Sequence, residues 1–185
     1  MDDKIMNLLN YFEHNGLLLC NVNSELPSLE TVGGDWDAIV TLMEQSHVFY
    51  SKLYKGRVTY LSAELYYALK PHKQCEARLS AESRRILQFV RQAGRATTAE
   101  IKNAVAMPKK DFDKAMDGLF KGLLLTATAR DRTLAASWSS FYWGSFEAWE
   151  GISPHKPRKI DPRELLSGIM TPRQIDRLLA YAKAL

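Results

Sequence analysis

The segment Leu79–Trp138 carries the pattern that most constrains the fold of this chain. Three stretches in it have apolar residues at helical spacing, and two stretches of β-type residues follow them. Thr97 and Glu100 form a capping-box pattern at the start of the second stretch. Pro108 separates the second stretch from the third, because proline breaks a helix interior but suits a first turn. We therefore expect three helices and a β-hairpin, the order of a winged helix-turn-helix.

The third expected helix, between Pro108 and Gly122, carries both basic and acidic residues away from its apolar stripe. In a winged helix this element and the hairpin tip are placed to meet DNA. Base reading favours Arg, Asn or Gln, and the stretch contains none of them. Two interpretations stay open, a solvated face of mixed charge or contacts to DNA phosphates. The lysines that would make such contacts are Lys109, Lys110, Lys114 and Lys121.

We place the turn of the hairpin at Ala129–Arg132, between strands Leu123–Thr128 and Thr133–Trp138. Arg130 and Arg132 would then lie at the tip. Guanidinium groups suit both phosphates and a narrow minor groove, so these two arginines are candidate DNA contacts. The alternative is an ordinary solvated hairpin tip.

Net charge divides unevenly along the 185 residues. Residues 1–75 hold six Lys and Arg against nine Asp and Glu, whereas residues 76–185 hold 19 against 12. The basic part coincides with the winged-helix pattern, which favours a nucleic-acid partner. The hydrophobic fraction of 46% is enough for a sizeable core in one large or two small domains.

The N-terminal part predicts a second unit of related organisation. A first helix ends at Asn15-Gly16, a short strand covers Leu17–Val22, and Asp35 caps another helix. A second hairpin turns at Lys55–Arg57. The following helix, which Ser62 caps, is expected to stop at Pro71, and Pro71–Arg78 is expected to be a linker. A helix followed by a hairpin suggests a diverged winged helix.

Three features are expected after the hairpin. Aromatic residues at helical spacing in Phe141–Glu150 predict a helix packed between domains, with a pocket or a protein interface as alternatives. Ser153–Pro162 indicates an extended linker whose cations could contact phosphate, namely Lys156, Arg158 and Lys159. Thr171-Pro172 begins a last helix that would pack on its own core or mediate a homodimer through Ile175, Leu178, Leu179 and Ala182.

The fold class that follows is α+β, with tandem winged helix-turn-helix units and a helical C-terminal extension. We divide the chain into residues 1–72, residues 78–150, and a linker with C-terminal helices at residues 151–185. No run approaches the length of a membrane helix, the N-terminus lacks a signal-peptide pattern, and two cysteines fit a reducing compartment. We expect a cytoplasmic protein.

Several motifs in the chain resemble the AlkZ-related winged-helix superfamily. They are ELPSL at Glu25–Leu29, Trp36, FYSKLYKGRVTYLSAELYYAL at Phe49–Leu69 and RLSAESRRIL at Arg78–Leu87. The resemblance covers about Leu17–Trp149. Named members are bacterial DNA glycosylases that remove alkylated or crosslinked bases, so the resemblance implies tandem winged-helix units and double-stranded DNA as the partner.

The catalytic part of the resemblance is not carried over. Those glycosylases are associated with a Gln-x-Gln pair that positions water, and no two glutamines of this chain are one residue apart: Gln45, Gln74, Gln88, Gln92 and Gln174. Common nucleotide and hydrolase motifs are absent, and His72-x-x-Cys75 alone does not make a metal site. We expect a non-catalytic DNA-binding protein, regulatory or repair-associated, without cofactor or metal. The alternatives are a glycosylase and a winged helix used for protein–protein contact.

Overall fold

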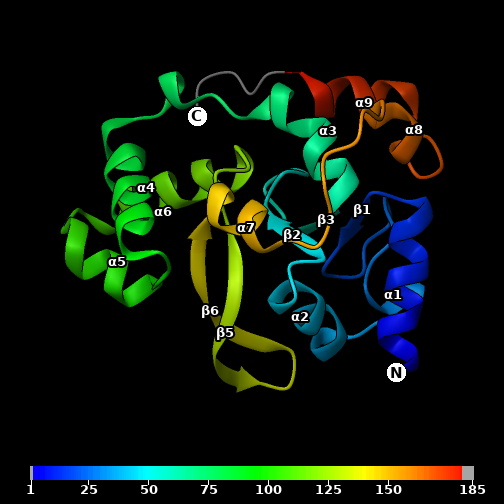
Figure 1. Cartoon of the computed structure of the whole chain (residues 1–185), viewed down its shortest axis with the longest axis horizontal. Helices are drawn as coiled ribbons and strands as arrows, with labels where there is room; N and C mark the ends of the chain where they lie inside the picture. The colour runs from blue at the N-terminus through cyan, green and yellow to red at the C-terminus, as the bar shows by residue number, and fades with distance from the viewer. Residues whose placement is uncertain (1, 181–185) are drawn as a thin grey trace.

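The computed structural model describes residues 2–180. In its first half, helices surround a small antiparallel sheet (Figure 1). Asp35 caps the second helix through its side chain, as the sequence predicts, and Asp2 caps the first. The elements are α1 (Asp3–His14), β1 (Leu17–Leu19), the 3₁₀-helix η1 (Glu30–Val32), α2 (Trp36–Glu44), β2 (Val48–Ser51), β3 (Thr59–Ser62) and α3 (Ala63–Lys73).

The second half contains the three helices and the hairpin that the sequence predicts, and the expected capping box at Thr97 and Glu100 is present. Its elements are η2 (Glu76–Arg78), α4 (Ala81–Ala93), β4 (Ala96–Thr97), α5 (Thr98–Val105), α6 (Lys109–Lys121), β5 (Leu125–Ala135), β6 (Trp138–Ser145) and α7 (Phe146–Ile152). Two helices follow, α8 (Pro162–Leu166) and α9 (Pro172–Leu179). The α+β class is confirmed.

The two sheets have the same topology. The strand orders are β1-β3-β2 and β4-β6-β5, so the last strand of each half lies in the middle. All pairs are antiparallel, with Leu17 opposite Leu61 in the first sheet and Ala96 opposite Trp143 in the second. The halves differ in that η1 stands where α5 stands, and in the length of the hairpin, which is much longer in β5–β6.

The ends of corresponding helices are built alike. Ser46 after α2 and Leu123 after α6 both have positive φ angles, 56° and 57°. The next backbone N–H in each case donates to the carbonyl five residues earlier, from His47 to Leu42 and from Leu124 to Leu119, both at 2.9 Å. The topology is therefore repeated down to the turn that leads into the hairpin.

A shared core joins the halves. Tyr50 of β2 packs on Phe120 of α6 and Trp143 of β6, with ring centroids 5.3 and 5.2 Å away. The Tyr50 backbone N–H, at the outer edge of β2, donates to Thr126 Oγ1 of β5 at 2.8 Å. Strands β2 and β5 therefore meet where the two sheets come together.

The aromatic segment Phe141–Glu150 packs between the halves, but its predicted helix is wrong over its first half. Phe141 and Trp143 lie in β6 and are buried on one face, as alternation in a strand requires. The helix begins only at Phe146, after the Ser145 cap. Trp149 is fully buried, 5.2 Å from the ring of Phe49 and 4.9 Å from that of Tyr66 in centroid distance.

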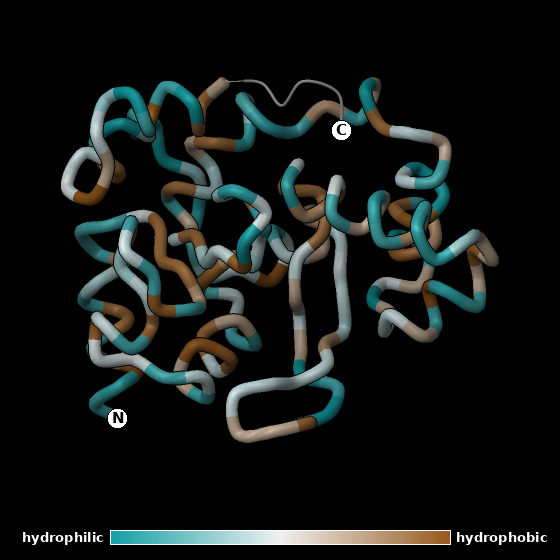
Figure 2. The backbone as a smooth tube through the Cα atoms, turned by 180° about the vertical axis from the view of Figure 1, so that it is seen from behind, coloured by the Kyte–Doolittle hydropathy of each residue, from teal (hydrophilic) through white to brown (hydrophobic). Residues whose placement is uncertain are grey.

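Two other local expectations are corrected. The hairpin does not turn at Ala129–Arg132, because β5 continues to Ala135 and the turn lies at Ala136-Ser137. Figure 2 shows this long hairpin projecting beyond the helices, and Leu134 and Trp138 near its tip are 56% and 61% exposed. Helix α3 also runs past Pro71 to Lys73, because proline in the last turn removes little of the helix's hydrogen bonding.

The described part of the C-terminal extension packs on its own chain. Ile175 and Leu178 of α9 are buried in a cluster with residues of β1, β2 and α3, whereas Ala182 lies outside the described residues. Between residues 2 and 180, no helix is long and apolar enough to span a membrane. Cys20 and Cys75 are both free thiols.

Candidate nucleic-acid interface

Helix α6 presents one basic face to the outside. Its apolar residues, among them Phe112 and Leu119, are buried, and the helix packs on α4. Because residues at i, i+4, i+7 and i+11 share a helix face, one line of charged side chains runs opposite this apolar stripe. It consists of Lys110, Lys114, Asp117 and Lys121.

The β2–β3 turn of the first half adjoins the C-terminal end of this face. Lys52 Nζ lies 2.6 Å from Asp117 Oδ1, which neutralises the acidic member of the line. The Lys121 side chain lies against Gly56, where an added Cβ would be 3.4 Å from Lys121 Cε. Sequence reasoning missed Lys52, because nothing in the local sequence places it beside α6.

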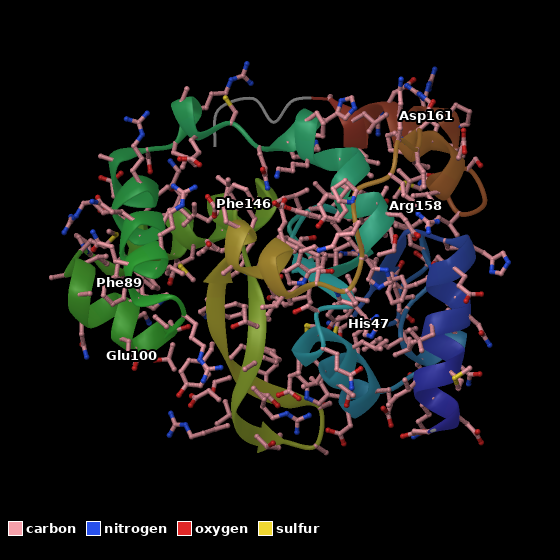
Figure 3. All side chains as sticks on the ribbon, viewed as in Figure 1. His47, Phe89, Glu100, Phe146, Arg158 and Asp161 are labelled. Carbon is pink, nitrogen blue, oxygen red and sulfur yellow. The ribbon has the colours of Figure 1, made fainter. Side chains whose placement is uncertain are left out.

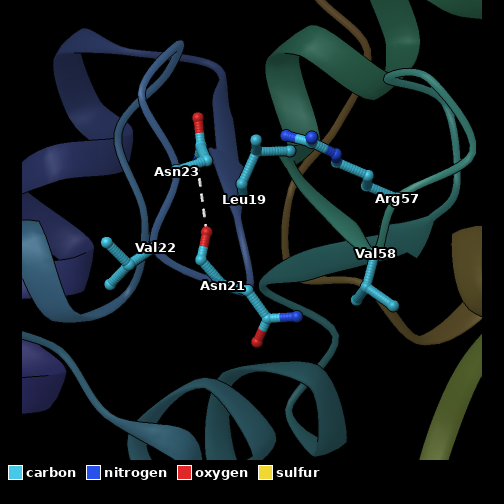
Figure 4. Close-up of a pocket in the computed structure, with 6 residues that line it drawn as sticks. All are labelled: Leu19, Asn21, Val22, Asn23, Arg57 and Val58. Carbon is cyan, nitrogen blue, oxygen red and sulfur yellow. Dashed lines mark hydrogen bonds between the residues drawn. The ribbon is translucent and has the colours of Figure 1, made fainter.

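The same turn directs its remaining cations away from α6. Lys55 Nζ donates to Glu25 Oε2 at 2.7 Å, and this bond, together with one from Tyr54, lowers the pKa of the Glu25 carboxyl. The Arg57 side chain reaches over a cavity of about 320 Å³ toward Leu19 and the Asn21–Asn23 loop (Figure 4). Carboxylates therefore balance Lys52 and Lys55, and the Arg57 side chain points away from α6.

The rest of the α6 charge is partly balanced. Lys109 lies off the line and pairs with Asp113 one turn later. Lys114 shares a small cavity with Asp111 and Glu82, although its own side chain is exposed. The basic face is therefore carried by Lys110, Lys114 and Lys121.

The two wing arginines do not lie at a hairpin tip. Arg130 is paired with Phe141 and Arg132 with Ser140, well inside the β5–β6 ladder. Arg130 Nη2 donates to Asp37 Oδ1 of α2 at 2.9 Å, and the Arg130 backbone N–H donates to Glu44 Oε1 at 2.9 Å. Its side chain is only 26% exposed, whereas that of Arg132 is 75% exposed. Contacts with α2 thus hold β5 where the sequence predicts a turn.

The linker cations form a separate group. Lys156, Arg158 and Lys159 are all exposed in the segment that connects α7 to α8. Figure 3 shows Arg158 beside α1 and α3, away from α6. The segment is fastened to the end of α2, because Ser153 Oγ donates to Ser46 O at 3.0 Å and the rings of His155 and His47 hydrogen-bond at 3.0 Å. These cations therefore do not extend the α6 face.

A partly buried polar network ties α3 to α7. The Tyr66 hydroxyl donates to Glu150 Oε1 at 2.7 Å, and Lys70 Nζ donates to the same oxygen at 2.6 Å. Gln74 Nε2 donates to the Leu123 carbonyl at 2.7 Å. Burial raises the pKa of the Tyr66 hydroxyl, so this group stays protonated as a donor. No set of three His, Cys, Asp or Glu side chains within residues 2–180 could hold a metal ion.

Comparison with known proteins gives one result. No curated protein and no solved structure matches the chain significantly. A family model described as AlkZ related matches residues 27–174, a range that runs from the loop before η1 into α9 and includes β2, β3 and the whole second sheet. Since the match covers most of the sequence, the chain belongs to the AlkZ-related family.

Proposed function

We propose that this chain is a tandem winged-helix protein that binds double-stranded DNA, chiefly through the phosphate backbone. The repeated element order, the matching sheet topology and the matching helix ends support two related units. Membership of the AlkZ-related family supports a DNA-repair theme and hence DNA as the partner. A cytoplasmic location is part of the same proposal.

The basic face of α6 carries the proposal. Exposed Lys110 and Lys114 and half-buried Lys121 share one stripe on the helix that a winged helix offers to DNA. Lysines are point charges suited to phosphate, and the helix carries no Arg, Asn or Gln to read bases. We therefore propose binding with little sequence preference, without a catalytic step.

The other candidate cations take secondary roles in this proposal. Arg132 is exposed on the hairpin and could contact a duplex that passes along it, while Arg130 holds the hairpin to α2. Lys109 is engaged with Asp113. We propose that Lys156, Arg158 and Lys159 add only long-range attraction, since they lie away from α6.

Titration of a DNA duplex at several salt concentrations tests the proposal. We compare Lys110→Ala/Lys114→Ala with the matched double variant Lys156→Ala/Lys159→Ala, in which all four lysines are exposed. Each phosphate contact contributes about 0.9 to the slope of log K against log salt concentration. In the α6 variant we expect this slope to decrease by the contribution of about two phosphate contacts. In the linker variant we expect a much smaller decrease. Equal losses, or salt-insensitive binding by the wild type, would overturn the assignment.

Base removal is the second candidate function, which family membership favours. Incubation of excess protein with duplexes that contain an alkylated or a crosslinked base, followed by detection of abasic sites, separates the two. We expect DNA binding without abasic product. Abasic product that depends on the protein would instead establish a glycosylase. A protein partner that buries the α6 lysines, with no DNA binding, would support the interaction-module alternative.

A further inference from the structure

A cavity of about 230 Å³ lies where the β2–β3 turn, the end of α3 and α9 meet. Three of its lining side chains are cationic, and no Asp or Glu is among the described residues that line it. The lining residues are Leu53, Tyr54, Lys55, Lys73, Gln174, Arg177 and Leu178. None of the three cations was singled out from the sequence.

Lys73 is the buried cation of this cavity. It lies in the last turn of α3, its exposed fraction is 8%, and its Nζ donates to the Ala180 carbonyl at 2.7 Å. An ammonium has three N–H donors, so this bond leaves further donors for a ligand. Burial lowers the pKa of Lys73, because an ammonium held away from water is costly unless a negative charge balances it.

Arg177 and Gln174 come from one face of α9, three residues apart. The Gln174 side-chain oxygen accepts from the Thr171 backbone N–H at 2.8 Å, which fixes the amide and leaves its NH₂ group as a donor. Arg177 lines the cavity and is exposed. Its planar guanidinium has five donors arranged to match an oxyanion.

The remaining cation, Lys55, already has a counter-charge in Glu25, which does not line the cavity. The positive charges of Lys73 and Arg177 therefore have no carboxylate opposite them in the described lining. Charged donors with this surplus of positive charge suit a compact anion with several acceptor oxygens.

We propose that this cavity binds a phosphate group, with Lys73 and Arg177 as its charged donors and Gln174 as a neutral one. The phosphate could be that of a DNA strand end or a free phosphate ester, both of which present the same oxygens. Only the DNA source rests on the function proposed above, so the site itself is tested without DNA.

Titration with inorganic phosphate, followed by ³¹P NMR and by thermal unfolding, tests the site. Sodium chloride at matched ionic strength controls for general salt effects. The variant is Arg177→Gln, and the matched control is Arg173→Gln, an exposed arginine of the same helix that does not line the cavity. Because both arginines are exposed, both variants are expected to fold.

We expect saturable phosphate binding by the wild type and by Arg173→Gln, and about tenfold weaker binding by Arg177→Gln, the loss of one charge-assisted contact. No phosphate effect beyond that of chloride would overturn the proposal. So would equal phosphate binding by the two variants.

Duplexes with 5′-phosphate or 5′-hydroxyl ends then identify the source. A preference of the wild type for the phosphorylated end that Arg177→Gln loses would assign the site to DNA ends. Inorganic phosphate binding without that preference would assign it to free phosphate esters. Failure of the DNA-binding proposal would leave the phosphate titration unchanged, so the two results are distinguishable.

Discussion

Helices α2 and α6 occupy the same place in the two halves, directly before the hairpin, yet their outward faces differ. The described polar residues on α2 include Asp37 and Glu44 and no cation, whereas α6 carries a line of lysines. Helix α2 uses its acids on the neighbouring half, since both contact Arg130 of β5. The same topology thus gives one helix, α2, whose acidic side chains bind the other half, and one helix, α6, whose lysines face outward.

The long β5–β6 hairpin lies against the acidic helix α2. Strand β5 lies along α2, and Trp36 Nε1 donates to Ser139 Oγ near the far end of β6 at 3.2 Å. The short β2–β3 hairpin instead ends beside α6, where Lys52 meets Asp117. Each hairpin therefore contacts the pre-hairpin helix of the other half, and only α6 keeps an exposed basic stripe.

The largest expected effect breaks the contact between the halves. Trp149→Ala removes a fully buried indole that packs on Phe49 and Tyr66. We expect a loss of about 3–5 kcal/mol in the free energy of unfolding, the usual cost of such a cavity. Urea unfolding measures it. The control Trp138→Ala, at a 61% exposed position, should change stability by less than about 0.5 kcal/mol. Similar losses in both variants would contradict the packing of α7 on the first half.

A smaller effect concerns the hydrogen bond between β2 and β5. Thr126→Val keeps the shape of a fully buried side chain but removes the acceptor of the Tyr50 N–H. An unpaired buried donor costs about 1–3 kcal/mol. Thr126→Ser keeps the hydroxyl and is the control for the lost oxygen. If Thr126→Val unfolds at the wild-type urea concentration, the two strands do not meet in this way.

The smallest expected effect is a pH dependence that the second half lacks. His47 follows α2 at the place where Leu124 follows α6. Burial, with a further contribution from the charge of His155, lowers the pKa of His47 below its ordinary value of 6.5. His47 and His155 line a cavity together with the charged residues Glu13, Glu64 and Arg158.

The sign of this dependence follows from linkage. As pH falls below 6.5, the unfolded chain binds a proton at His47 before the native protein does, so stability falls. We expect the melting temperature to drop between pH 7.5 and pH 5.5, and His47→Leu to reduce that drop. Carboxyl groups with lowered pKa values act only at lower pH. The control is His14→Gln, at an exposed position of α1. An unchanged drop in His47→Leu would contradict the prediction.

Local signals in the sequence were enough for most helices and for their starts. Asp35, Ser62 and Thr97 cap helices as expected, since a cap depends on residues within one turn. The long hairpin could not be placed this way, because the contacts of Arg130 with α2 come from residues more than 80 positions away. The strand Phe141–Ser145 was mistaken for a helix, since a short aromatic run fits both periods.

The candidate sites also contain some residues that local sequence predicts and others that only tertiary contacts bring together. The lysine line on α6 follows from helix periodicity and could be predicted. Lys52 beside Asp117, and the meeting of Lys73 with Arg177, depend on how the chain folds back over 65 and 104 residues and leave no trace in local sequence.

Lysine-reactive footprinting with and without a DNA duplex tests the central claim that α6, and not α2, faces DNA. Lys110, Lys114 and Lys121 report on α6, and Lys4, whose Nζ lies 2.7 Å from the α2 cap Asp35, reports on α2. We predict that DNA protects the three α6 lysines from acetylation and leaves Lys4 as reactive as before. Protection of Lys4 with no protection of Lys110 and Lys114 would contradict the account.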